Sequence, residues 1–153
     1  MAMSLLFERL VWESIHHDSE DSPMTDSLLD RPLVPIADES DAEATHAALV
    51  DHVEPATARP VVIHVVDTDR QRGTDAIERF ESLAATSGLT VETYLKDGTE
   101  ITDTLCHTAE EVDASAIVFC SRGGSAWFDL LAGGVRTSLI AKSDYPVVML
   151  PTA

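Results

Sequence analysis

The chain has 153 residues, of which 27 are acidic and 10 are basic, so its formal net charge is −17. A chain of this length is expected to form one domain with its own hydrophobic core. The acidic balance argues against nucleic acid and anionic membranes as partners, because both reward clustered lysine and arginine. Concentrated salt screens repulsion between like charges, so we expect a halophilic protein; an ordinary acidic cytosolic protein is the alternative.

The cysteines and the hydropathy pattern favour a cytoplasmic location. Cys106 and Cys120 fall in a predicted helix and a predicted strand, and two such cysteines do not suggest a disulfide framework. No apolar run approaches the ~18 residues of a membrane span. The apolar N-terminus lacks a basic region and reaches Glu8 too soon for a signal peptide.

Residues 1–30 differ in composition from the rest of the chain. A short apolar patch within residues 5–15 is followed by a polar, charged and turn-prone run over residues 16–23. We therefore predict a poorly ordered extension over residues 1–30 and one domain over residues 31–153. Met24 would serve as a natural start, so residues 1–23 are either native sequence or an upstream translation.

From Arg31 onward, short apolar segments alternate with segments of helical periodicity. The first half of the domain is predicted to contain a strand at 33–36, a helix capped within 38–41 and ending near 53, a strand at 60–66, a loop at 67–73 and a helix closed by Gly88. The second half is predicted to contain an edge strand at 89–95, a helix starting after Thr99 or Glu100 and reaching 112, a strand at 116–120, a helix at 135–142 and a strand at 146–150.

Strict alternation of strands and helices predicts an α/β fold with three layers, in which an open parallel sheet of five strands is covered by helices on both faces. Ligands of such sheets bind beyond the carboxyl ends of the strands, where the winding reverses. The glycine-rich stretch 121–125 follows the strand at 116–120, and Gly133 and Gly134 precede the last helix. Backbone N–H groups in such loops can bind an anion. Alternatively, the glycines only allow close packing of helix on strand.

Several short segments together carry a family resemblance. They are Leu33-Val34-Pro35-Ile36, His64-Val65-Val66, Ser121-Arg122-Gly123, Gly133, and Tyr145-Pro146-Val147-Val148. Over about residues 31–151 the chain resembles the universal stress protein family. The resemblance implies the strand order 3-2-1-4-5, with the reversal between the first and fourth strands. It also implies a homodimer in which the last strands of two subunits pair in antiparallel fashion.

Nucleotide-binding members of this family carry the motif G-x2-G-x9-G-[S/T], whose amides and final hydroxyl hold ATP phosphates. Its four positions fall on Cys120, Gly123, Gly133 and Gly134, so two of the four match. The Asp that usually ends the first strand is replaced by Ala37, with Asp38 next to it. The resemblance therefore implies a degenerate site for ATP or AMP. Its candidate cofactor-binding residues are Ala37, Asp38, Val65, Phe119, Cys120, Arg122, Gly123, Gly133, Gly134 and Val135.

The remaining ionisable residues give no sign of catalysis. No Ser-His-Asp set, paired catalytic carboxylates, metal cluster or P-loop lysine is visible, so we expect neither an enzyme nor a metal site. His64 is predicted to be a hydrogen-bonded core histidine. Arg122 and Arg136 are the local counter-charges expected for the acids near the first crossover. Those acids are Asp38, Glu39, Asp41, Glu43 and Asp51.

Two functions remain open on this basis. The first is a regulatory stress-response protein with a degenerate ATP-binding cleft at the ends of the first and fourth strands. The second is a dimeric protein-interaction module that binds no nucleotide and has a vestigial cleft.

Overall fold

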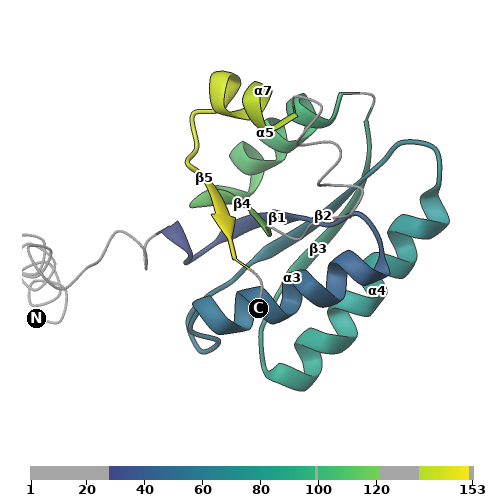
Figure 1. The fold of residues 1–153 in the computed structure, drawn as a ribbon, viewed down its shortest axis with the longest axis vertical. Helices are drawn as coiled ribbons and strands as arrows, with labels where there is room; N and C mark the ends of the chain where they lie inside the picture. The colour runs from purple at the N-terminus through teal and green to yellow at the C-terminus, as the bar shows by residue number, and fades with distance from the viewer. Residues whose placement is uncertain (1–27, 99, 121–134, 152–153) are drawn as a thin grey trace, which may run out of the picture.

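The computed structural model describes residues 28–98, 100–120 and 135–151. Within them lies a parallel sheet of five strands in the order β3-β2-β1-β4-β5, so the predicted fold class and strand order are confirmed (Figure 1). Along the chain the elements are β1 (Pro32–Pro35), α3 (Glu39–His52), β2 (Val61–Val66), α4 (Arg70–Ser87), β3 (Glu92–Asp97), α5 (Ile101–Val112), β4 (Ala116–Cys120), α7 (Val135–Lys142) and β5 (Val147–Leu150).

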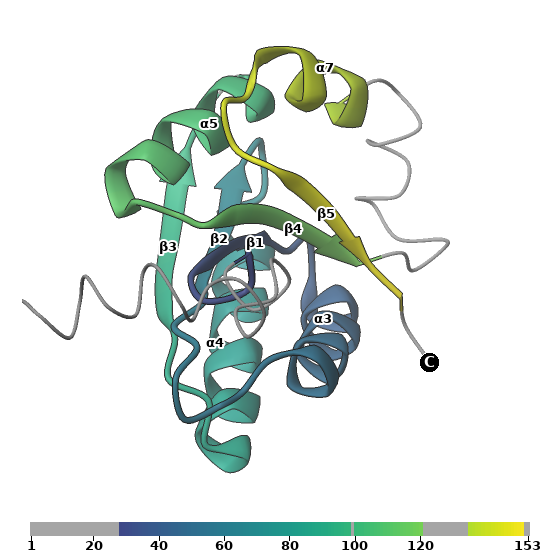
Figure 2. The same ribbon diagram turned by 90° about the vertical axis from the view of Figure 1, so that its left-hand side faces the viewer.

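Helices cover both faces of the sheet, as expected for a sheet built from crossovers. Figure 2 shows α3 and α4 on one face and α5 with α7 on the other. Successive strand residues alternate between the two resulting cores. Val34 and Val118 pack in the α3/α4 core, whereas Leu33 and Ile117 pack in the α5/α7 core. The central strands are therefore apolar on both faces apart from His64 in β2, which is why they show no alternation in sequence.

Pro35 ends the central strand β1 without interrupting the sheet. The pairing of β1 with β4 covers Pro32 and Leu33, and Pro35 lies beyond that register. On the β2 side, Pro35 is paired with Ile63, and the ladder continues through the Ile36 N–H to the Ile63 carbonyl at 2.9 Å. A proline at this strand end therefore needs no N–H group.

The sequence-based boundaries are wrong at two places. Residues 70–73 belong to α4 rather than to a loop, because Asp69 caps the helix by accepting the Arg72 N–H at 3.0 Å. The third strand begins at Glu92 rather than Leu89. Leu89 belongs instead to the end of α4: it follows the left-handed Gly88, and its N–H donates to the Ala84 carbonyl. Its side chain is buried in the α3/α4 core, which accounts for an apolar residue at this position. The edge position predicted for this strand is confirmed.

Packing of the described chain begins before Arg31. Leu29 is buried in the α3/α4 core, and the Leu28 carbonyl accepts the Ser115 hydroxyl at 2.6 Å. Residues 1–27 of the predicted extension lie outside the described residues.

Both cysteines are free. None of the helices in the described ranges combines the length and the apolar character needed to cross a membrane.

Candidate functional site

The winding of the sheet reverses at β1, which lies between β2 and β4. Because all of these pairings are parallel, the carboxyl ends of the three strands meet at one edge. This edge holds five of the predicted site residues: Ala37 and Asp38 after β1, Val65 in β2, and Phe119 and Cys120 at the end of β4. Val135 is the first residue of α7, and the chain enters that helix from the same edge because β4 and β5 are parallel. The remaining predicted residues, Arg122, Gly123, Gly133 and Gly134, lie outside the described residues.

Two aspartates shape the chain where it leaves β1. Asp38 is the N-cap of α3, and its Oδ1 accepts the Asp41 N–H at 2.8 Å. The Oδ2 of Asp41 in turn accepts the Ala37 N–H at 2.8 Å. Asp41, one of the acids expected near the first crossover, is only 4% exposed. Its carboxylate holds the backbone instead of facing solvent.

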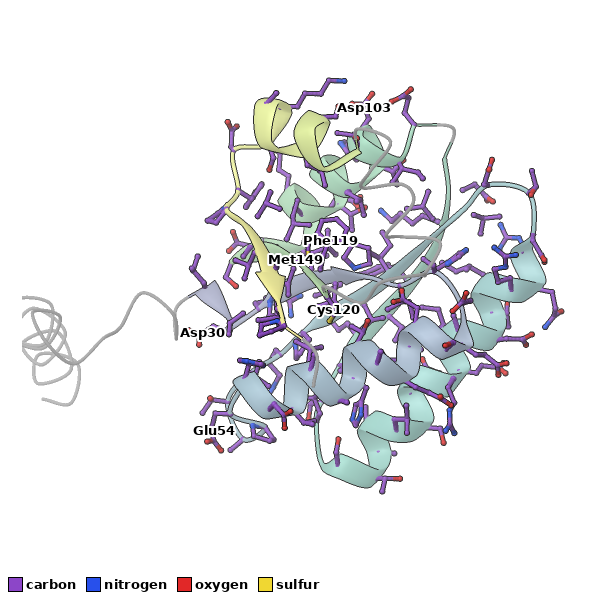
Figure 3. The ribbon with its side chains drawn as sticks, in the orientation of Figure 1. Asp30, Glu54, Asp103, Phe119, Cys120 and Met149 are labelled. Carbon is purple, nitrogen blue, oxygen red and sulfur yellow. The ribbon has the colours of Figure 1, made fainter. Side chains whose placement is uncertain are left out.

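Phe119 and Cys120 end β4 on opposite faces of the sheet (Figure 3). Phe119 is buried in the α5/α7 core, whereas Cys120 packs against the α3/α4 core. The Cys120 thiol forms a hydrogen bond with Thr45 of α3, and burial raises the pKa of Cys120 to about 11. A thiol with this pKa is protonated at neutral pH. Cys120, at the first glycine position of the motif, thus acts as a packing group on the α3 side of the sheet.

His64 is a hydrogen-bonded core histidine, as the sequence predicts. Its ring is buried, and Nδ1 lies 2.9 Å from the carbonyl oxygen of Ile36, the residue that follows the neighbouring strand β1. Burial lowers the pKa of His64, while the bond to Ile36 works in the opposite direction.

A cavity of about 420 Å³ lies at this edge between the segments that follow β1 and β2. Its lining residues are polar or charged: Asp38, Glu39, Ser40, Asp69, Gln71, Arg72 and Asp75. The four from α4 and its cap were missed by the sequence analysis, because three of them, Asp69, Gln71 and Arg72, fall in residues 67–73, which were assigned to a loop. The available signal was Asp69, a capping residue three positions before Arg72.

Two arginines of α4 lie near the acids of the first crossover; the predicted counter-charge Arg122 lies outside the described residues, and the side chain of Arg136 is not described either. Arg72 lines the cavity together with Asp38, and Arg79 binds Glu43 through an Nε–Oε2 contact of 2.9 Å. Both arginines belong to α4, which the sequence analysis did not connect with this edge. In the described part of the chain, no group of three or more His, Cys, Asp or Glu side chains could hold a metal ion.

No family model matches the sequence, and no curated protein matches it. Solved structures do match. A universal stress protein from Archaeoglobus fulgidus is 25% identical, with a TM-score of 0.60 over 78% of this chain and 98% of that chain. The universal stress protein from A. fulgidus in complex with dAMP is 22% identical, with a TM-score of 0.59 over 80% and 98%. A universal stress protein in complex with cAMP is 19% identical, with a TM-score of 0.56 over 80% and 98%.

The topology and its open edge define an α/β protein of the doubly wound class. Within that class the chain has the fold of the universal stress proteins, and its resemblance to that family is confirmed.

Proposed function

We propose that the chain is a universal stress-type regulatory protein of the cytoplasm that binds an adenine nucleotide, ATP or AMP, at the carboxyl ends of β1 and β4. The observation that carries this proposal is the meeting of these strand ends at the winding reversal, in a fold for which two of the comparison structures are complexes, one with dAMP and one with cAMP. Such reversals are where ligands of open α/β sheets bind.

On this proposal the ends of β1 and β4 supply one side of the nucleotide site. Ala37 and Asp38 lie on one side of the reversal, and Phe119 with Cys120 ends the strand on the other. The orientation of Cys120 toward Thr45 supports the proposal, because its side chain is packed against α3 rather than projecting from the strand end. Arg122, Gly123, Gly133, Gly134 and Val135 are proposed to meet the phosphates from the other side.

The charge of the edge bears on which nucleotide binds. Four carboxylates and one guanidinium line the cavity beside Asp38. At low ionic strength these carboxylates repel a triphosphate more strongly than a monophosphate. In molar salt the Debye length falls to about 3 Å, so the affinity then depends mainly on direct contacts with the phosphates. Binding is therefore best measured in concentrated KCl, with AMP and ATP compared side by side.

A second proposal concerns dimerisation, which both candidate functions share. β5 is an edge strand, and its Met149 side chain is 36% exposed, the one large apolar side chain classed as exposed among the described residues (Figure 3). An apolar edge strand favours pairing with a second copy. We expect light scattering to give twice the chain mass, and Met149→Lys to shift the protein toward monomer. A monomeric unsubstituted protein in molar KCl would contradict this proposal.

The nucleotide proposal is tested by following backbone amide resonances during titration with AMP in concentrated KCl. We expect shifts at the amides of Ala37, Asp38 and Cys120 and none at Arg31 and Ser115, which lie at the amino ends of β1 and β4. If millimolar AMP and ATP shift none of the crevice amides, the interaction module without nucleotide becomes the better account.

A further inference from the structure

His64 contacts both segments that enclose the cavity. On one side, its Nδ1 lies 2.9 Å from the carbonyl oxygen of Ile36, the residue before Ala37 and Asp38. The ring is 7% exposed, so water does not replace this partner freely. The imidazole therefore fixes the end of β1 from the neighbouring strand.

On its other side the same ring lies directly against α4. A Cβ atom built on Gly73 would be 2.3 Å from Cδ2 of His64 and 2.9 Å from its Nε2. Such contacts are too close for a real side chain, so this position of the helix admits only glycine while the ring stays in place. Gly73 lies one turn after the cap at Asp69, and the ring thus also sets how close the start of α4 comes to β2.

These two contacts fix the separation of the cavity walls. One wall is the segment 38–40, which follows the Ile36 carbonyl, and the other is the segment 69–75, which contains Gly73. Each wall is held by a hydrogen bond of its own, from the Ala37 N–H to the Asp41 carboxylate and from the Arg72 N–H to the capping Asp69. His64 is the buried group that connects them.

We propose that neutral His64 is a positioning residue that sets the width of the cavity between the segments after β1 and β2, and that its protonation loosens both walls and weakens nucleotide binding at the adjoining end of β1. This inference rests on the proposed function. The charged groups around the ring are Asp38 after β1, and Asp69 with Arg72 at the start of α4, while β3 contributes the apolar Leu95. A proton on Nε2 would place a second N–H and a charge against the backbone of Gly73 and the side chain of Leu95. Burial in these surroundings keeps the ring neutral at neutral pH.

Two substitutions separate positioning from general packing. His64→Asn keeps an N–H donor near the place of Nδ1 but cannot titrate, whereas His64→Leu keeps bulk and removes the donor. Affinity for AMP is measured in concentrated KCl from about pH 8 down to about pH 5. We expect the unsubstituted protein to lose affinity as the pH falls from 6.5, the ordinary pKa of histidine, toward the lowered pKa of His64. His64→Asn should be nearly independent of pH in this range. At the upper end, His64→Leu should bind about tenfold more weakly, and His64→Asn, which keeps the bond to Ile36 but not the ring contact with Gly73, should bind with an affinity between the two.

A measurement without ligand separates this inference from the proposed function. Hydrogen exchange is followed at the Ala37 and Arg72 amides, one on each wall, and at the Ala114 amide, which donates to Ala109 at the far end of α5. We expect His64→Leu to speed exchange about tenfold at both walls but not at Ala114. His64→Asn should restore the Ala37 wall, because it keeps a donor for the Ile36 carbonyl, but not the Arg72 wall, because it has no ring against Gly73. If no protein binds AMP, the proposed function fails and exchange alone decides this inference. Unchanged wall exchange in His64→Leu, or equal pH profiles for the unsubstituted protein and His64→Asn, would overturn it.

Discussion

The side chains of Asp38 and Asp41 hold the backbone between β1 and α3 through two consecutive hydrogen bonds. Asp38 accepts the Asp41 N–H, and Asp41 accepts the N–H of Ala37, the residue before Asp38, each at 2.8 Å. The chain is therefore fixed on both sides of the cap before any ligand arrives. The Ala37 amide is also taken, so a ligand at this edge must find its hydrogen-bond donors elsewhere.

Removal of the Asp41 carboxylate should destabilise the protein. Asp41→Ala leaves the Ala37 N–H without this acceptor next to the buried end of β1, and an unsatisfied buried donor costs about 1–3 kcal/mol. Asp41→Asn retains an acceptor oxygen and should lose less. Urea unfolding in concentrated KCl measures both, with the exposed neighbour Glu39→Ala as the matched control. Equal stabilities for Asp41→Ala and Glu39→Ala would show that the buried bond contributes little.

Most of the architecture could be predicted from the sequence because its signals are local. Unbroken β-branched runs identify the buried strands, and Asp38 and Gly88 identify helix ends. The start of α4 was missed since charged residues 69–72 resemble a loop until Asp69 is recognised as a cap. The burial of Asp41 and the contact of His64 with Gly73 could not be predicted, because both depend on how the crossovers pack in three dimensions.

Cys120 should react slowly with thiol reagents. Its pKa is raised to about 11 by burial, so at about pH 8 only about one thiol in a thousand is ionised. Burial raises the pKa of Cys106 as well, but that thiol lines an open cavity between α5 and the segment before β5. We predict that alkylation of the native protein modifies Cys106 first. The rate of alkylation in the Cys106→Ser and Cys120→Ser variants assigns each reaction to one thiol. Preferential labelling of Cys120 would mean that its side chain is exposed at the crevice.

The free energy of unfolding should fall as the solution becomes acidic, partly through His64. Its folded pKa lies below the ordinary value of 6.5, so the folded state binds fewer protons than the unfolded state. The contribution is complete above pH 6.5 and is lost as the pH falls from 6.5 toward the folded pKa. The pKa of His46 is also lowered by burial, but its contribution cancels when the unsubstituted protein is compared with His64→Asn. Thermal unfolding should show a smaller loss for His64→Asn over this range, and identical slopes would contradict the assignment.

Salt should stabilise the fold strongly. With a net charge of −17, the like charges of the folded surface repel one another in dilute buffer. Added salt shortens the Debye length and so screens this repulsion. We predict that the unfolding temperature rises steeply with KCl concentration. Choline chloride at matched ionic strength distinguishes screening from specific binding of the cation. A protein that is fully folded and equally stable in dilute buffer free of Mg²⁺ would show that the charge reflects no adaptation to salt.

The most direct test of the nucleotide crevice is calorimetric titration of AMP and ATP into the protein in concentrated KCl, with Gly134→Ser measured in parallel. Gly134→Ser restores the hydroxyl that the family motif places there, and one such hydrogen bond is worth about 0.5–1.5 kcal/mol. The account predicts saturable binding by the unsubstituted protein and tighter binding by Gly134→Ser. No heat of binding from either protein at millimolar nucleotide would contradict it.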